Sequence, residues 1–431
     1  MLGTYQEASP VNCCCWPIRT MARTLLLVTG IVLSLVLLSG CDTESYSEGL
    51  RYPTRTDPIV SGTPPLEATP EAPDTPGQMP LTSLADLADL KHPLNQEPGL
   101  ENKILSPAKL SAEQRGKLET LLEKAFGTPA NPKVAGIDTA AVSLLKLDEA
   151  TLAEGSRLYR RHCLHCHGLT GDGRGPTAPW VNPHPRDYRQ GVFKFTSTKL
   201  DLGVRKARRD DLLRTLRQGI EGTSMPSFVL LHDNELEALV SYVIHLSLRG
   251  EVEYETLKTI LTVGLEGTID EAVQQRLTVF GQRWVDNEQP ENHIAPDPYP
   301  YDRSNTEQMR ASARRGWNLF KLKTDAGCIG CHEDYGRKLK FTIDSWGTLV
   351  RRTDLTLGIY RGGRRPIDLY WRVHSGINGS FMPSFGNVLV PDEKQKAKGH
   401  PLWDMVNFLQ VLPYPRMREQ YGIDIDEKLP D

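Results

Sequence analysis

The chain of 431 residues has only one long hydrophobic run, and that run lies near its N-terminus. A membrane protein with several spans is therefore excluded. The formal net charge is only −3, which gives no general reason to expect nucleic-acid binding. Strand-like alternation is weak, and no nucleophile triad, phosphate loop or carboxylate pair stands out. What the sequence does contain is eight cysteines, grouped as three, one, two and two along the chain.

The hydrophobic run covers residues 24–40, carries no charge and follows Arg19 and Arg23, as in a secretory signal. It ends in Leu-Ser-Gly before Cys41, which resembles a bacterial lipobox and implies a lipidated Cys41 after cleavage. Met21 is a candidate for the true start. The alternative is an uncleaved single transmembrane anchor, because 17 apolar residues are just enough to span. Both interpretations place the rest of the chain on the periplasmic side of the cytoplasmic membrane.

Composition and hydrophobic periodicity divide the chain into regions of different expected structure. The expected fold class is mainly α, with two tandem helical domains, extra helices and a disordered N-terminal tether. The expected regions are a signal peptide (1–40), a Pro-rich tether (41–105), a helical lead-in (106–150), a first domain (151–250), a helical acidic linker (251–302), a second domain (303–412) and a C-terminal tail (413–431).

The two domains look like an imperfect internal repeat. Each begins with a helix that carries a glycine and an aromatic residue, continues with Cys-x-x-Cys-His, and reaches a Met-Pro-Ser-Phe segment 50 to 58 residues later. Each then ends in an amphipathic helix. The repeated positions are Cys163, Cys166, His167 and Met225 in the first domain and Cys328, Cys331, His332 and Met382 in the second.

The Cys-x-x-Cys-His spacing places two thiols and an imidazole on one turn. This is the arrangement that attaches haem c, with two thioether bonds and a histidine ligand to iron. The sequence therefore predicts two covalently bound haem c groups, with His167 and His332 as iron ligands. A zinc site is the alternative, but it needs further soft ligands, and the mature chain has no other cysteine than Cys41. A site that pools all four thiolates would leave both histidines and both Met-Pro-Ser-Phe segments unexplained.

The sixth iron ligand is expected from the opposite side of each ring. Met225 and Met382 are the candidates, because each is followed by a proline that stiffens its loop and both lie in the same tetrapeptide. The alternative is a purely structural role, in which each methionine fills space in the hydrophobic core. A histidine could also replace the methionine, namely His184 or His232 in the first domain and His374 in the second.

At these motifs the sequence resembles a tandem of two class I c-type cytochrome domains, as in a dihaem bacterial lipoprotein. The resemblance covers residues 151–250 and 303–412. It implies that the first and last helices of each domain cross at Gly155, Tyr159 and Tyr242, and at Gly316, Phe320 and Phe408. It also implies that a carbonyl at Pro176 accepts a hydrogen bond from His167. The second domain has no Gly-rich run after His332, so the group that orients this ring stays open.

Weaker candidates are the residues that would hydrogen-bond the haem propionates, for which solvated surface is the competing interpretation. They are Trp180, Arg186 and Tyr188 in the first domain and Arg351, Arg361 and Trp371 in the second. His162 and His165 are expected to point to solvent.

The expected function is electron transfer between respiratory redox partners, without enzymatic activity. The first domain carries a charge of +5, the second +8 and the linker −8, so acidic redox partners are expected, together with the membrane and no nucleic acid. Two alternatives remain open. One is a dihaem peroxidase, which needs an open iron site, and the other is a fixed electron-transfer subunit of a respiratory complex.

Overall fold

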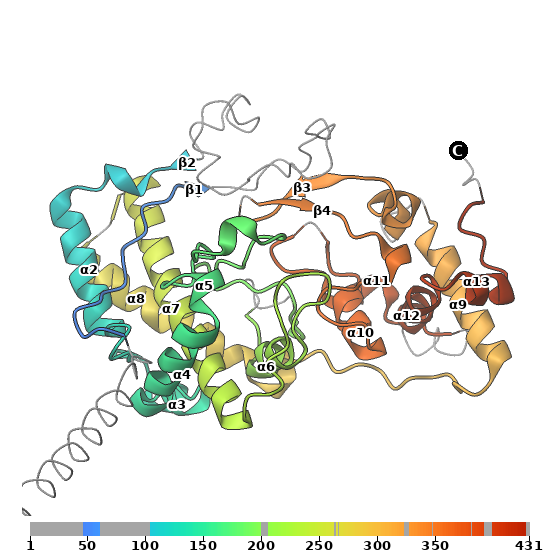
Figure 1. Cartoon of the computed structure of the whole chain (residues 1–431), viewed down its shortest axis with the longest axis horizontal. Coiled ribbons are helices and arrows are strands. Elements are labelled where there is room, and N and C mark those ends of the chain that lie inside the picture. Colours follow the sequence, from blue (N-terminus) through green and yellow to red (C-terminus); the bar gives the residue numbers. More distant parts are fainter. Residues whose placement is uncertain are drawn as a thin grey trace, which may run out of the picture. The chain divides into compact units, whose positions relative to one another are not determined.

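The computed structural model describes residues 46–60, 104–199, 206–262, 264–265, 267–322, 327–346, 348–380, 382–391 and 399–427. The predicted signal peptide, Cys41 and most of the predicted tether lie outside these residues. Within them the fold is mainly helical, as the sequence predicts (Figure 1). The buried apolar residues form two clusters, which define a first unit (residues 46–287) and a second unit (residues 294–427). None of the described helices has both the length and the apolar character that crossing a membrane requires.

The first unit is built around the long helix α7, against which the helices before and after it pack. Its helices are α2 (Ala112–Phe126), α3 (Thr139–Leu144), α4 (Glu149–His162), the short α5 (Leu164–His167), α6 (Arg209–Gln218), α7 (Asp233–Thr262) and α8 (Ile269–Asn287). Asp148 starts α4 as its N-cap, because its side chain accepts from the Thr151 amide at 3.0 Å.

The crossing of α4 and α7 depends on a glycine. A Cβ atom at Gly155 would lie only 2.2 Å from the Ala238 carbonyl oxygen, so a larger residue would push the helices apart. The rings of Tyr159 and Tyr242 pack beside this contact with centroids 5.2 Å apart. The predicted helix crossing of the first domain is confirmed.

The second unit repeats this arrangement. Its helices are α9 (Thr306–Phe320), α10 (Pro366–Ser375), the short α11 (Gly386–Leu389), α12 (Pro401–Val411) and α13 (Pro415–Tyr421). At the crossing of α9 and α12, a Cβ atom at Gly316 would lie 2.0 Å from the Asp404 carbonyl oxygen. Phe320 and Phe408 pack beside it with ring centroids 5.4 Å apart. This crossing too matches the prediction.

The predicted domain boundaries differ from the two cores. Residues 46–60, which the sequence assigns to a disordered tether, run along the first unit and bury Tyr52 and Ile59 in its core. Two residues of this segment, Arg55 and Asp57, form a buried ion pair with nitrogen and oxygen 2.7 Å apart. The boundary at 250 is wrong as well, since α7 runs through it without a break. Sequence composition missed these contacts because the segment is polar and its apolar residues are widely spaced.

Strands are few in the described part of the chain. β1 (Ile59–Val60) pairs antiparallel with β2 (Ile104–Leu105), and β3 (Phe341–Ile343) pairs antiparallel with β4 (Leu349–Arg351). The β3–β4 hairpin belongs to the long insertion between the Cys-x-x-Cys-His motif and the methionine of the second unit. Its turn contacts the first unit, as described below.

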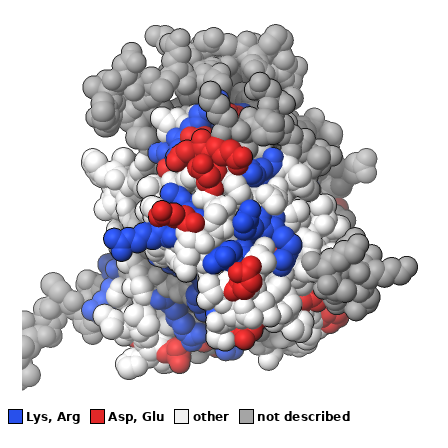
Figure 2. Space-filling model, turned by 90° about the vertical axis from the view of Figure 1, so that its right-hand side faces the viewer, with Lys and Arg blue, Asp and Glu red and all other residues white. Residues whose placement is uncertain are grey.

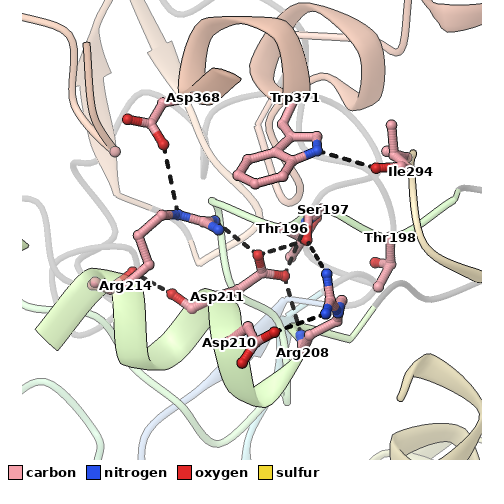
Figure 3. Close-up of polar contacts among 12 residues, drawn as sticks. Thr196, Ser197, Thr198, Arg208, Asp210, Asp211, Arg214, Ile294, Asp368 and Trp371 are labelled. Carbon is pink, nitrogen blue, oxygen red and sulfur yellow. Dashed lines mark hydrogen bonds and ion pairs between the residues drawn. The ribbon is translucent and has the colours of Figure 1, made fainter. Parts of the chain in front are cut away.

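The two units contact each other along α6 and α10. Arg214 on α6 pairs with Asp211 at 2.8 Å and with Asp368 on α10 at 3.9 Å (Figure 3). The guanidinium of Arg214 also lies 4.7 Å from the ring centroid of Trp371 on α10. Asp211 and Asp368 hold the same place in the repeat, because each is the third residue of its helix and accepts from the backbone amide of the preceding arginine, Arg208 or Arg365. Equivalent helices therefore face each other across the contact.

Candidate haem sites

The attachment motif of the first unit lies where α4 ends and α5 begins. The amide of His167 donates to the Cys163 carbonyl at 2.9 Å, which closes one helical turn around both cysteines. The following Gly-rich loop folds back over this turn, with the amides of Gly173 and Gly175 donating to His167 and Cys166. Neither cysteine forms a disulfide. The two thiols and the imidazole are thus held on one face of a fixed turn.

The orientation of the buried His167 ring is fixed from two directions. Its Nδ1 lies 3.1 Å from the Arg186 carbonyl oxygen, and its ring stacks on Tyr188 with centroids 4.8 Å apart. The predicted acceptor at Pro176 is therefore wrong, because the chain reaches the ring only with the later segment 185–188. Desolvation lowers the pKa of His167 to about 4, against the opposing effect of the Arg186 carbonyl. The ring is neutral at pH 7, and a proton on Nδ1 leaves the lone pair of Nε2 available to a metal.

Met225 lines the same cavity as His167. The loop after α6 is closed by hydrogen bonds from the Ile220 amide to the Met225 carbonyl at 3.1 Å and from the Met225 amide to Thr223 Oγ1 at 3.1 Å. Cys163, Cys166, His167 and Met225 all line one cavity of 370 Å³. The rest of its wall is mostly apolar, with Phe193, Leu216 and Val243 among the lining residues. The four predicted ligands and attachment points of the first site are therefore brought together.

The remaining sequence candidates divide between the cavity and the surface. His184 lines the cavity, whereas His232 is exposed and does not. Trp180 is 83% exposed and also lies outside it. His162 and His165 were expected to point to solvent, but both line the cavity, His165 with an otherwise exposed side chain.

The attachment motif of the second unit forms a similar turn. The amide of His332 donates to the Cys328 carbonyl at 2.8 Å, and neither Cys328 nor Cys331 forms a disulfide. Where the first unit has its Gly-rich loop, Asp334 and Tyr335 take left-handed backbone angles, with φ of 50° and 57°. This turn buries Tyr335, whose hydroxyl accepts from Trp317 Nε1 at 2.8 Å.

The segment after β4 contacts the attachment turn of the second unit, which has no Gly-rich loop. Arg352 donates to the Cys331 carbonyl at 2.6 Å, and the backbone of Thr353 is the group that favours protonation of His332. Desolvation is the larger effect and lowers the pKa of His332 to about 4, so this ring is neutral at pH 7 as well. The Nδ1 atom of His332 is buried and has no partner within hydrogen-bond distance among the described residues, so the group that orients this ring stays open.

The methionine loops of the two units share one hydrogen-bond pattern. The Ile377 amide donates to the Met382 carbonyl at 3.0 Å, as Ile220 does to Met225, and the Met382 amide donates to Ser380 Oγ at 3.3 Å. In both loops the serine after the proline donates to the last turn of the preceding helix, Ser227 to Arg217 and Ser384 to His374. Met382 and Cys328 both pack against the second core. The structure therefore repeats the hydrogen bonds of the loop as well as the tetrapeptide.

Several residues of the first cavity were not found by sequence reasoning. Lys194 lines it between two phenylalanines, and Asp344 reaches it from the second unit. Arg361 lines it too, although the sequence places this residue at the second haem. Asp344 carries no local signal, because its role depends on a contact across 150 residues of sequence.

Comparison with known proteins bears on the first unit. The family described as cytochrome C oxidase, cbb3-type, subunit III matches residues 150–243, which include α4, the attachment motif, the methionine loop and the start of α7. No curated protein matches the chain in sequence. Among solved structures, the chain is similar to the reducing HAO-like protein complex of Kuenenia stuttgartiensis, with 20% identity and a TM-score of 0.40, over 60% of this chain and 95% of that chain. The first unit therefore has the helical fold, the attachment motif and the family likeness of a c-type cytochrome domain, which carries covalently bound haem c.

Proposed function

We propose that this chain is a membrane-anchored dihaem c-type cytochrome that transfers single electrons between respiratory redox partners outside the cytoplasmic membrane. The observation that carries the proposal is the first cavity, which is lined by two cysteines, His167 and Met225 together with mostly apolar residues. Haem c fits this donor set, because it needs two thiols, one neutral imidazole and one soft ligand on the far side.

The residues of the chain determine what such a site does. Haem c supplies an iron that accepts and releases one electron. His167 keeps its proton on Nδ1, where the Arg186 carbonyl accepts it, so that Nε2 remains a ligand. Met225 would hold the iron together with His167, and the mostly apolar lining would limit the access of water. If both side chains bound the iron, a small substrate would find no open position, which favours a carrier over a peroxidase.

A second haem c is proposed for Cys328, Cys331, His332 and Met382. Its support is the repeat of the first site's turn and methionine loop, including the neutral histidine. Two sites in one chain would allow an electron to enter at one unit and leave at the other.

The proposed partners are redox proteins with acidic docking surfaces. Support comes from the charges of +5 and +8 on the predicted domains. Figure 2, which faces the second unit, shows Lys and Arg side chains in several groups separated by Asp and Glu. Such a mixed surface suits transient, salt-sensitive encounters.

The proposed anchor is a lipid on Cys41. Replacing Cys41 by serine is expected to move the holoprotein from the membrane fraction to the soluble periplasmic fraction. If the variant stays in the membrane with an unprocessed N-terminus, the single transmembrane anchor is the correct interpretation instead.

The central test is a haem count and redox titration of the purified protein. The pyridine haemochrome assay is expected to give two haems per chain, and near-infrared spectra of the oxidised protein should show methionine–iron bands from both. A five-coordinate haem that turns over peroxide would contradict the carrier function. A count of one haem would limit the proposal to the first unit.

A second candidate function is a fixed subunit of a respiratory complex. The observation in its favour is the family match, whose printed description is an oxidase subunit. Extraction in mild detergent followed by size-exclusion chromatography separates the two functions. A carrier is expected to elute alone, whereas a fixed subunit should elute with other chains at every salt concentration.

A further inference from the structure

The cavity of the first site is not closed by the first unit alone. Four residues of the second unit line it, namely Asp344, Thr348, Val350 and Arg361. Two of them lie at the β3–β4 turn, Val350 lies in β4 and Arg361 follows in the basic stretch 361–365. The methionine and histidine of the first site are thus enclosed by side chains from more than 100 residues away in sequence.

This wall is held in place by contacts between the units. The Trp346 indole Nε1 donates to the Asp187 carbonyl at 3.1 Å, and the buried indole ring lies 3.6 Å from the Arg186 guanidinium. Lys194 of the first unit pairs with Asp344 at 3.0 Å. A further contact between the units is made by Arg214 on α6, which pairs with Asp211 of its own helix and with Asp368 on α10 (Figure 3). The second unit is therefore a fixed part of the cavity wall.

The charge of the cavity is unbalanced. Arg161, Arg186, Lys194 and Arg361 line it, and Asp344 is its one acidic lining residue. Arg186 is 3.8 Å from Asp344, which it shares with Lys194, so one carboxylate faces two cations. Desolvation, together with the nearby Arg186 and Arg361, lowers the pKa of Lys194 to about 8, although Asp344 opposes the shift. Arg186 and Lys194 share one carboxylate, and no acidic side chain of the described residues pairs with Arg361, so this part of the cavity favours a ligand with an anionic end.

We propose that the second unit completes the first haem site, with Arg361 reaching across the interface to share the haem propionates with Arg186 and Lys194. The inference rests on the proposed function, because it needs haem c in the cavity. A haem is apolar with two carboxylates at one edge, which matches a mostly apolar cavity where Lys194 interacts with two arginines, Arg186 and Arg361. Arg361, which the sequence assigns to the second haem, is thereby moved to the first.

Two opposite shifts in reduction potential follow. A positive charge beside the haem disfavours the ferric form, so removing it lowers the midpoint potential, whereas removing Asp344 raises it. The expected size is a threefold to tenfold change in the reduction equilibrium of one haem, or about 30 to 60 mV for one electron. The other haem should change less.

The experiment is a potentiometric titration of the full-length holoprotein, followed by visible spectra. R361Q is expected to lower one midpoint, R361K to restore it, and D344N to raise the same one. R364Q is the matched control, because Arg364 lies in the same stretch but pairs with Glu221 and Tyr414 outside the cavity.

Each outcome separates this inference from the proposed function. If R361Q and R364Q shift a midpoint equally, or neither shifts it, the inference is overturned while the haem count still supports a cytochrome. If the parent protein carries no covalent haem, the proposed function itself fails. Should R361Q not accumulate, the opposite shift expected of D344N decides alone, and its absence overturns the inference.

Discussion

At the scale of single residues, the first site combines a rigid histidine with an adaptable methionine. His167 is held by a carbonyl and a stacked ring, so its direction is set before any ligand binds. Met225 depends on its loop, since the thioether itself is flexible. The two proposed ligands are therefore expected to respond differently to substitution, and the methionine offers the cleaner probe.

Replacing Met225 by alanine is expected to lower the midpoint potential of one haem, because methionine ligation favours the ferrous form. The fall should be a sizeable part of the roughly 0.8 V that axial ligands can span. Spectroelectrochemistry with near-infrared detection measures both this shift and the loss of one methionine–iron band. M417A is the control, since Met417 lies on α13, outside both proposed sites. An unchanged band in M225A would show that another residue is the ligand.

A second residue-scale prediction concerns His245, which is buried in α7 and whose Nε2 donates to the Phe126 carbonyl at 2.9 Å. Desolvation lowers the pKa of His245 to about 4, although this carbonyl opposes the shift. The unfolded chain therefore binds this proton at higher pH than the folded chain. The contribution of His245 to the free energy of unfolding should be fully present above about pH 6.5. It should fall by about 3 kcal/mol as the pH drops toward 4, with no further loss from this group below that.

The measurement is the free energy of unfolding in denaturant at a series of pH values. H245Q keeps a donor for the carbonyl but cannot titrate, so its stability should depend less on pH between 6.5 and 4 than that of the parent protein. An identical slope in both proteins would assign the acid sensitivity to other groups.

At the scale of the helices, the glycine at each crossing decides how closely two elements approach. G155A should destabilise the first unit by about 1–3 kcal/mol, because the new Cβ would overlap the Ala238 carbonyl. Chemical unfolding monitored by circular dichroism gives the value. G116A is the matched control, since Gly116 lies in α2 with no atom within 4 Å of its Cβ, and alanine there should stabilise by about 0.5–1 kcal/mol. Equal effects of the two substitutions would mean that the crossing tolerates a methyl group.

How far the sequence predicts the molecule differs from element to element. The attachment turns and the methionine loops follow from short-range spacing, whereas the crossings at Gly155 and Gly316 follow from the resemblance to class I c-type cytochromes, and the structure contains all of them. The acceptor for His167 is misplaced by ten residues, from Pro176 to Arg186, because loop length does not reveal where a chain turns back. The buried segment 46–60 and the wall supplied by Asp344 depend on contacts far apart in sequence, which no local pattern encodes.

At the scale of the whole molecule, the N-terminal segment 46–60 is fastened to the first core. Arg189 holds this segment, with Asp57 at 2.9 Å and Asp187 at 2.8 Å, all of them nearly buried. The segment and the first candidate haem site therefore share one ionic cluster, since Asp187 follows the residue that accepts from His167.

Replacing Arg189 by glutamine should cost about 3–5 kcal/mol, because the buried carboxylate of Asp187 loses its ion-pair partner, while Asp57 keeps Arg55 and Arg174. Limited proteolysis is expected to cut within residues 46–60 faster in this variant. R51Q is the control, since the Arg51–Glu123 pair is about half exposed and contributes about 1 kcal/mol or less. Equal cleavage rates would show that apolar contacts alone fasten the segment.

Trp346 and its neighbour Ser345 connect the loops of the two candidate sites, which restricts how each unit can change independently in evolution. Trp346 is bonded to Asp187, next to the acceptor of His167, while Ser345 donates to the Gly379 carbonyl, three residues before Met382. A substitution that displaces one ligand loop therefore disturbs the other. The two halves are not interchangeable modules, and exchanging either for a single-domain relative would require matching changes in its partner.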